Sequence, residues 1–351
     1  MKTIIYSLSI LIVITTALPY IRHEAWWIRI FDFVRFQILI ISIPTILLGL
    51  YFLDLTTVDV LCPFVVFVCA LLQIRRVFPY TFFAHKEVKG VRDKEVEEDE
   101  KKLSLIVCNV YMYNSKYMKV VKLIEDKQPD FLLLLEPNKF WTESIDPFMS
   151  DYRYKVLHPK EDTYGIALFS KKELDNVELR FLTDKEVPSI RANVKMSDGR
   201  WFDLYCVHPK PPFPSEHDSS LQRDVELIKI GKEIKKNKRP TILVGDLNDV
   251  AWSRTTRLFQ KISGALDPRI GRGFFSTYHA DVIFFRWPLD HVFHSKEFRL
   301  HKLKTLHHVG SDHFPIYTEL FFDAGNENER AERPDEEEQE VIEDKLEEYK
   351  S

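Results

Sequence analysis

Cysteine is scarce in this sequence, and its spacing excludes a cysteine-based metal site. The 351 residues include four cysteines, with no CxxC pair or other metal-type spacing. Cys62 and Cys69 lie in an apolar run, and Cys108 and Cys206 lie in predicted buried strands. We therefore expect four buried free thiols, a pattern that neither requires nor excludes an oxidising compartment.

A strong excess of basic residues is also missing. The formal net charge is -4, and residues 323–351 carry 13 Asp and Glu against 4 Lys and Arg. Residues 103–322 are left with a net charge near +4. This mildly basic region suits a phosphate-bearing substrate, but no stripe of Arg and Lys supports a tight grip on duplex DNA.

Charged residues are absent from three long apolar stretches near the N-terminus, at residues 3–20, 36–53 and 60–74. Each stretch is near the lower length limit for crossing a bilayer. None has the polar face that a helix at the surface of a soluble core would show. We therefore predict a membrane region at residues 1–85 with two to three transmembrane helices.

The first stretch has two interpretations. It follows Lys2, as a secretory signal would, but it lacks a small-x-small cleavage site, which favours a retained span. The aromatic and basic residues after it, including Trp26, Trp27 and Arg29, are typical of a membrane interface, although an ordinary amphipathic connector has the same composition.

The flanking charges predict an orientation. Six Lys and Arg residues lie between Arg75 and Lys94, whereas the turn at residues 54–59 holds two Asp and no Lys or Arg. The positive-inside rule then places the chain from residue 75 onward in the cytoplasm, as part of a multi-pass protein of the cell (inner) membrane. Residues 86–102 are predicted to be a charged, solvated linker, and residues 323–351 an acidic tail that is disordered or loosely helical.

Residues 103–322 have the pattern of an α/β domain. Helical spacing predicts helices at 116–127 and 219–236. Several of the expected strands are apolar throughout, which favours stacked sheets with helices outside. The predicted strands are 103–110, 131–135, 164–170, 190–196, 201–208, 241–244, 289–294 and 314–322.

Polar residues stand at the ends of these strands. Strand ends that share one rim of a sandwich can converge on one site, and carboxylates, amides and imidazoles there would bind a hard cation and transfer protons. Each of these residues alone could also have a purely structural role, as a turn residue, a hydrogen-bonded amide or a packed histidine. The residues are Asn109, Glu136, His208, Asp246, Asn248, Asp290, Asp312 and His313.

The order of these motifs carries a resemblance to a known family. The chain shows, in order, Cys108-Asn109-Val110, Leu135-Glu136-Pro137, Tyr164-Gly165-Ile166, Val207-His208-Pro209, Gly245-Asp246-Leu247-Asn248, Leu289-Asp290-His291 and Ser311-Asp312-His313. Over residues 103–322 it resembles the endonuclease/exonuclease/phosphatase superfamily, the deoxyribonuclease-I-like fold, in a membrane-anchored bacterial form. The resemblance implies a four-layer α/β sandwich, with two packed mixed β-sheets flanked by helices.

The resemblance also implies roles for individual residues. Glu136, Asn109 and Asp312 would bind Mg²⁺ or Mn²⁺. Asp246 would orient or deprotonate the attacking water, Asn248 would hold a phosphate oxygen, and His208 would stabilise developing charge. His313 would act in acid–base chemistry, held in one tautomer by Asp290. The segment 271–279 holds Arg272 and is a candidate substrate-binding loop, with a purely structural loop as the alternative.

The expected function is therefore metal-dependent hydrolysis of a phosphoester. The substrate partner stays open between nucleic acid, the generic family substrate, and a lipid phosphate or phospholipid headgroup, which the predicted bilayer anchor favours. No obligate protein partner is evident. A non-catalytic membrane scaffold is the rival from another class, and it predicts the loss of a metal ligand or base, whereas every expected residue is present.

Overall fold

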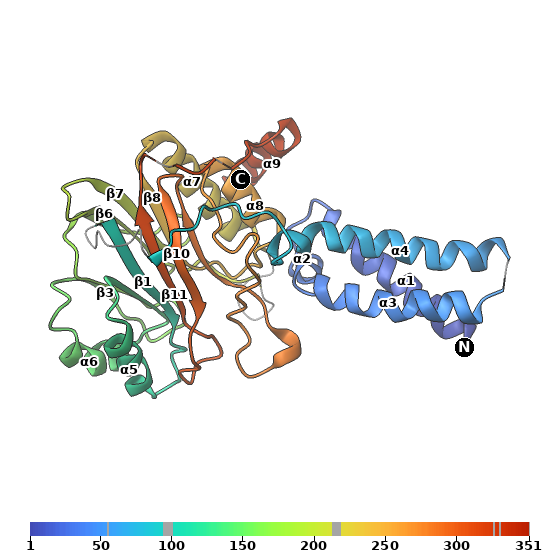
Figure 1. Ribbon diagram of the computed structural model, residues 1–351, viewed down its shortest axis with the longest axis horizontal. Coiled ribbons are helices and arrows are strands. Elements are labelled where there is room, and N and C mark those ends of the chain that lie inside the picture. Colours follow the sequence, from blue (N-terminus) through green and yellow to red (C-terminus); the bar gives the residue numbers. More distant parts are fainter. Residues whose placement is uncertain (55, 94–100, 213–218, 326, 330, 351) are drawn as a thin grey trace.

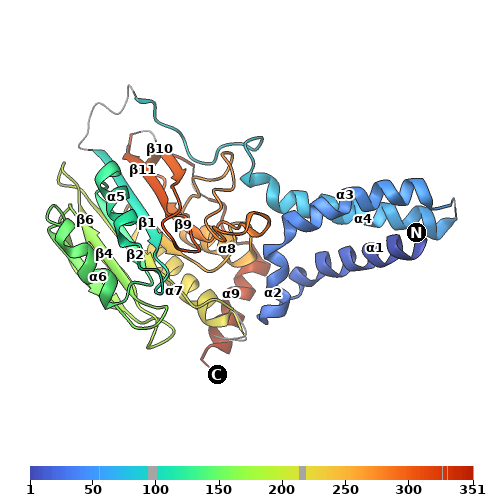
Figure 2. The ribbon, with the colours of Figure 1, turned by 90° about the horizontal axis from the view of Figure 1, so that it is seen from below.

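The computed structural model describes residues 1–54, 56–93, 101–212, 219–325, 327–329 and 331–350. A bundle of long helices projects from one side of an α/β domain, as Figures 1 and 2 show from two directions. The N-terminus lies at the far end of this bundle, and the C-terminus lies against the domain.

Three helices of the bundle are long and apolar enough to cross a membrane: Lys2–Tyr20, Arg35–Phe52 and Thr57–Tyr80. They contain α1 (Lys2–Ala17), α3 (Arg35–Phe52) and α4 (Thr57–Val77), and α1 packs against both others. Lys2 pairs with Asp54 at the end remote from the domain. The short helix α2 (Trp26–Phe33) joins α1 to α3 at the root of the bundle.

The domain holds two mixed sheets. The first has the strand order β10-β11-β1-β2-β4-β3, and the second has the order β5-β6-β7-β8-β9. β1 and β2 run parallel, as do β7 and β8, and the other neighbours are antiparallel. The bounds are β1 (Lys102–Asn109), β2 (Phe131–Leu135), β3 (Tyr154–His158), β4 (Ile166–Ser170), β5 (Leu174–Arg180), β6 (Ser189–Lys195), β7 (Trp201–Val207), β8 (Thr241–Asp246), β9 (Asp290–His294), β10 (Phe298–Thr305) and β11 (Ile316–Phe322).

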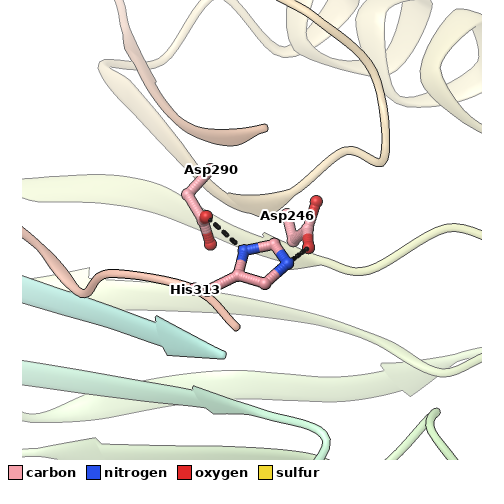
Figure 3. Close-up of side chains that lie close together, drawn as sticks. All are labelled: Asp246, Asp290 and His313. Atoms are coloured by element: carbon pink, nitrogen blue, oxygen red, sulfur yellow. Dashed lines mark hydrogen bonds and ion pairs between the residues drawn. The ribbon is translucent and has the colours of Figure 1, made fainter. Parts of the chain in front are cut away.

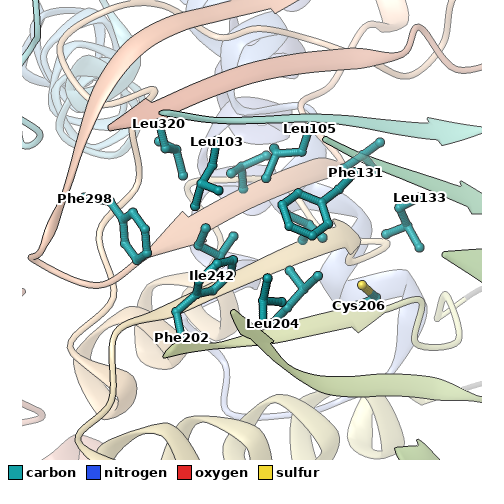
Figure 4. Packing of buried hydrophobic residues seen from close by; sticks show 14 of the residues in the cluster. Leu103, Leu105, Phe131, Leu133, Phe202, Leu204, Cys206, Ile242, Phe298 and Leu320 are labelled. Atoms are coloured by element: carbon teal, nitrogen blue, oxygen red, sulfur yellow. The ribbon is translucent and has the colours of Figure 1, made fainter. Parts of the chain in front are cut away.

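Alternate residues of each strand build the layers. Leu103 and Leu105 of β1 meet Phe202 and Leu204 of β7 in the core between the sheets (Figure 4). The opposite face of the first sheet packs against α5 (Tyr117–Lys127) and α6 (Lys139–Ile145). The outer face of the second sheet packs against α7 (Leu221–Asn237) and α8 (Arg254–Ser263). The four-layer prediction is therefore confirmed.

The segment before β1 is not the solvated linker that its charge predicted. Val88 is fully buried in the core between the sheets. The backbone N–H of Val91 donates to the carbonyl of Leu300, so residues 88–91 run along the edge strand β10. Lys102 already belongs to β1. The prediction is wrong for residues 86–93, because a few apolar residues within a charged segment suffice to cover a sheet edge. Residues 94–100 lie outside the described residues.

The C-terminal tail, predicted to be disordered or loosely helical, is helical over residues 336–348, so the disordered alternative is wrong there. Residues Glu336–Glu348 form helix α9, which begins with a capping box between Asp335 and Glu338. Its apolar side, Val341 and Ile342, packs against side chains of α7 and α8. The helix was not predicted with certainty from the sequence, because its apolar face consists of few residues within a run of glutamates.

Candidate active site

The polar strand ends meet in one cavity of about 410 Å³ at the rim of the sandwich. β1 and β2 run parallel, so Asn109 and the residue after β2, Glu136, lie at the same edge of the first sheet. β7 and β8 run parallel in the second sheet, which brings His208 and Asp246 together. The cavity is lined by Glu136, His208, Asp246, Asn248, Asp312 and His313, among others.

Two glycines allow the strands to approach closely at this rim. A Cβ atom at Gly245 would lie 1.8 Å from the carbonyl oxygen of Val207, and one at Gly165 would lie 2.0 Å from that of Pro137. The carbonyl of Gly165 accepts the backbone N–H of Glu136 at 2.9 Å. Only a residue without a side chain fits these positions, so both glycines fix where the polar groups next to them lie.

Glu136 and Asn248 have left-handed backbone conformations, with φ of 61° and 51°. This region is sparsely populated by residues other than glycine and is found more often at functional sites. Asn248 also closes a turn, because its backbone N–H donates to Oδ1 of Asp246 at 2.8 Å. The turn holds the Asp246 carboxylate toward the cavity.

His313 is held between two carboxylates (Figure 3). Its Nδ1 lies 2.8 Å from Oδ2 of Asp290, and its Nε2 lies 3.5 Å from Oδ2 of Asp246. All three residues are buried. The hydroxyl of Ser311 accepts the backbone N–H of His313 at 3.0 Å, which fixes the turn that presents the ring.

The electrostatics of this triad favour a charged imidazole. Burial alone would lower the pKa of His313. The nearby carboxylates of Asp290, Asp246 and Asp312 raise this pKa by more than burial lowers it, and the net result is a pKa of about 10. Burial raises the pKa of Asp246, an effect that His313 opposes and Asp290 reinforces. At neutral pH the ring is therefore an imidazolium that can donate from both nitrogens.

Glu136 has an unsatisfied oxygen inside the site. Oε1 accepts from the amide of Asn109 at 2.8 Å, whereas Oε2 is buried and has no hydrogen-bond partner among the described residues. Burial raises the pKa of Glu136 to about 7. A buried carboxylate oxygen without a donor is one that a cation would satisfy.

The carboxylates of the site can therefore accommodate a metal. Asp246, Asp290 and His313 place potential ligand atoms within 4.8 Å of one another, and since His313 is charged, the two carboxylates are the ones that can face a cation. Asp312 lies on the cavity wall and interacts electrostatically with both Glu136 and His313. These oxygens form a hard, negatively charged donor set that fits Mg²⁺ or Mn²⁺.

His208 and Asn248 face the cavity from the second sheet. Burial lowers the pKa of His208 to about 4, and the nearby His313 adds to this, so the ring is neutral at pH 7. Its Nδ1 has no partner in the part of the chain that the structure describes. The amide of Asn248 donates to the carbonyl of Pro209 at 2.9 Å, and Arg223 donates to the carbonyl of Asn248 at 2.8 Å.

Arg272 lies outside this cavity. Its guanidinium donates to the carbonyl of Pro268 at 3.2 Å and to that of Val88 at 2.5 Å, and burial lowers its pKa. The assignment of Arg272 to substrate binding is therefore corrected: the side chain fastens residues 86–93 to the domain. The same segment does reach the site through Tyr278, whose ring centroid is 4.9 Å from that of His313.

Several residues of the cavity were not anticipated from the sequence. Helix α2, at the root of the helical bundle, contributes Trp26, Arg29, Ile30 and Phe33. Its mixture of aromatic and basic residues indicated a membrane interface, and nothing local indicated a wall of the site. Other additions are Tyr111, Thr163, Pro211, Pro212 and Trp287, whereas Tyr164, Tyr278 and Leu289 lie in segments that the sequence had already singled out.

Comparison with known proteins agrees with this geometry. The family model described as Endonuclease/Exonuclease/phosphatase family matches residues 106–313, which is more than half of the chain. No curated protein sequence matches the chain. Solved structures do match, at sequence identities that support likeness of fold alone.

Three of the structures illustrate the range. TDP2 of D. rerio, complexed with a single-strand DNA product, has a TM-score of 0.52 at 17% identity, covering 62% of this chain and 98% of that one. The human Nocturnin catalytic domain with bound sulfate has a TM-score of 0.51 at 16% identity, covering 63% and 94%. A Bacteroides thetaiotaomicron mannosyl-6-phosphatase has a TM-score of 0.51 at 17% identity, covering 63% and 100%.

Proposed function

The chain belongs to the endonuclease/exonuclease/phosphatase family, and from this premise we propose that it is a membrane-anchored, divalent-metal-dependent phosphoester hydrolase. One observation carries the proposal. His313, paired with Asp290 and Asp246, lies in the same cavity as Glu136, whose Oε2 has no partner among the described residues. Two proteins of similar fold support phosphoester chemistry: one is named a mannosyl-6-phosphatase, and the other was solved with a single-strand DNA product.

The metal would be held by Glu136, Asn109 and Asp312, with the carboxylates of Asp246 and Asp290 close by. Bound there, Mg²⁺ or Mn²⁺ would polarise a phosphoryl oxygen and offset the negative charge that develops in the transition state. Asn109 has a second role in this arrangement, because its amide holds Oε1 of Glu136 at 2.8 Å and fixes the carboxylate.

The protein's own side chains would handle the protons. Asp246 would accept a proton from the attacking water, a task that its raised pKa suits. The imidazolium of His313, held by Asp290, would stabilise negative charge on the phosphoryl group by donating from Nε2. Neutral His208 would donate one N–H to a non-bridging oxygen, and the amide of Asn248 would hold another.

The helical bundle would anchor this site at a membrane. Its three helices are apolar enough to span, and α2, which directly precedes α3, lines the proposed catalytic cavity. Arg75 and Arg76 end α4 on the side of the domain, whereas the turn at the far end holds Asp54 and Asp59. By the positive-inside rule, the catalytic domain would be cytoplasmic, at the cell (inner) membrane.

Hydrolysis of bis(p-nitrophenyl) phosphate by the purified full chain in Mg²⁺ or Mn²⁺ tests the proposal. His313→Ala and Glu136→Ala should each reduce turnover by about 100-fold or more, while far-UV circular dichroism stays unchanged. His301→Ala is a matched control, because His301 lies on β10 among Asp93 and Glu319, away from the cavity. Full activity in either site variant would contradict the proposed mechanism.

A further inference from the structure

We propose that the substrate is a membrane-resident phosphoester whose lipid part reaches the cavity from the bilayer, between helix α2 and the loop 281–286. The inference rests on the proposed hydrolase function and names its substrate class. It depends on how the cavity is walled, on what lies between the cavity and the membrane helices, and on how few arginine and lysine side chains line the cavity.

The wall of the cavity is partly membrane-proximal. Helix α2 lines it with Trp26, Ile30 and Phe33, and only Val34 separates α2 from the transmembrane helix α3. The carboxylates of the site therefore share a cavity with a helix that lies at the root of the helical bundle, where the chain would leave the bilayer.

The lining of the cavity is amphipathic. Its polar part consists of the catalytic side chains, and its apolar part includes Ile30, Phe33, Trp287 and Leu289. Among the described residues that line it, Arg29 is the only arginine or lysine, and its guanidinium lies 3.2 Å from Glu24. A nucleic-acid strand would call for several cations along its backbone, whereas one phosphate on an apolar chain matches the lining as it is.

The loop beside the cavity exposes an apolar tip. Ile283 and Phe284 are 71% and 83% exposed, and both neighbours, Val282 and Phe285, are also exposed. The carbonyl of Phe284 accepts from the side chain of Gln37 at 2.8 Å, and Gln37 lies in the first turn of α3. Phe82 and Phe83, just after α4, are exposed to a similar degree. Such a patch at the base of transmembrane helices is expected to enter the membrane interface.

Aromatic rings connect this tip to the catalytic histidine. The ring centroid of Phe285 lies 5.8 Å from that of Trp287, and Trp287 also lies 5.6 Å from Phe33 of α2. Trp287 stacks on Tyr278 at 6.1 Å, and Tyr278 lies 4.9 Å from His313. An acyl or isoprenoid chain would therefore meet apolar side chains from the interface to the reacting phosphate.

A substrate panel on the full chain in lipid vesicles with Mg²⁺ tests this inference. The probes are phosphatidic acid, phosphatidylglycerol and a long-chain isoprenoid monophosphate, each beside a short-chain, water-soluble counterpart, with single- and double-stranded oligonucleotides as competitors. At least one long-chain probe should have a kcat/KM about 100-fold or more above that of its short-chain counterpart, because several buried methylene groups supply that factor. Equal rates for the long and short chains, or a preference for oligonucleotides, would overturn the inference.

Variants at the tip separate delivery from chemistry. The double change Ile283→Ser and Phe284→Ser should reduce kcat/KM on the preferred vesicle probe about 10-fold through KM, while turnover of bis(p-nitrophenyl) phosphate stays at the wild-type level. The control is Phe140→Ser, because Phe140 is exposed on α6 at the side of the domain remote from the membrane helices. An unchanged vesicle rate, or an equal loss on both substrates, would contradict the role of the tip.

The two proposals fail in distinguishable ways. If bis(p-nitrophenyl) phosphate is not hydrolysed in Mg²⁺ or Mn²⁺ and no member of the panel is cleaved, both the hydrolase function and this inference fall. If it is hydrolysed and His313→Ala abolishes the reaction, but a long chain brings no advantage, only the lipid assignment falls.

Discussion

The Nδ1 atom of His313 lies 2.8 Å from a carboxylate oxygen of Asp290, and Oδ1 of Asp290 has no hydrogen-bond partner among the described residues. This pairing fixes the orientation of the ring and favours its charged form. It also links strand β9 to the loop before β11, two segments that belong to different sheets. The proposed acid–base part of the site is therefore assembled across the sandwich.

Asp290→Asn should reduce kcat on bis(p-nitrophenyl) phosphate by about 100-fold and leave KM nearly unchanged, because the ring loses the carboxylate that orients and charges it. The pKa of His313, followed by NMR, should fall toward its ordinary value. Asp203→Asn serves as a control, since Asp203 is buried in β7 and bonds to Asn193. Wild-type turnover in Asp290→Asn would contradict the assignment.

The close approach at Gly245 predicts a large effect of a single methyl group. Gly245→Ala should destabilise the domain by about 3 kcal/mol or more, because its Cβ would overlap the carbonyl of Val207. The midpoint of thermal unfolding should fall by about 6 to 12 °C. Gly325→Ala is the matched control, since the nearest atom to its Cβ would be Oδ1 of Asp323 at 3.7 Å. Equal midpoints for the two variants would be incompatible with this packing.

The order of apolar runs and polar residues predicted much of the fold and site. β1, β2 and β8 are buried runs that end at or beside Asn109, Glu136 and Asp246, so their positions followed from local sequence. Their convergence follows from the parallel pairs in each sheet. Edge strands were harder to predict: β5 is mostly exposed and β3 alternates in burial, so neither has an apolar run.

Contacts between remote segments could not be predicted. The indole of Trp252 donates to the carbonyl of Asp32 at 2.7 Å, which docks α2 beside the catalytic domain. Arg272 was assigned to substrate binding because an arginine in a loop near the motifs can bind an anion. Only the fold shows that its guanidinium donates to the carbonyl of Val88 instead. Each of these contacts joins segments more than 180 residues apart, and neither segment carries a local sign of its partner.

Helix α9 should stabilise the domain through Lys345. Its Nζ lies 2.7 Å from the buried Asp224 and also pairs with Glu24. Lys345→Met should cost about 3 kcal/mol at pH 7, because it leaves a buried carboxylate with one partner fewer. Lys350→Met, on the exposed side of the chain's end, should change little.

The pH dependence of this effect has a definite sign. Burial alone would raise the pKa of Asp224. Lys345 and Arg223 together lower this pKa by more than burial raises it, so the folded-state pKa lies below the unfolded one. The stability that this carboxylate contributes is present above its unfolded pKa and is lost as the pH falls. The difference between Lys345→Met and wild type, measured by thermal unfolding, should therefore shrink below about pH 4. A constant difference down to pH 3 would contradict the ion pair.

The contribution of Glu87 to stability should depend on pH in the opposite direction. Burial raises its pKa to about 7, so its contribution to stability is present below the unfolded pKa and is lost as the pH rises through 7. Glu87→Gln keeps an acceptor for the backbone N–H of Asp267 and cannot ionise. The variant should gain about 1 to 3 kcal/mol over wild type between pH 5 and pH 8 in thermal unfolding. No such gain is expected for Glu125→Gln, which is exposed on α5, and an equal gain in both variants would refute the argument.

The central claim is that Glu136 and its neighbours form a divalent-metal site, and direct Mn²⁺ binding to the full chain tests it without relying on turnover. Titration followed by electron paramagnetic resonance should show one tight site in wild type. Glu136→Gln should weaken it at least about 10-fold. Glu87→Gln, which also replaces a buried glutamate of raised pKa but lies outside the cavity, should leave it unchanged. Equal Mn²⁺ affinity in wild type and Glu136→Gln would contradict the account.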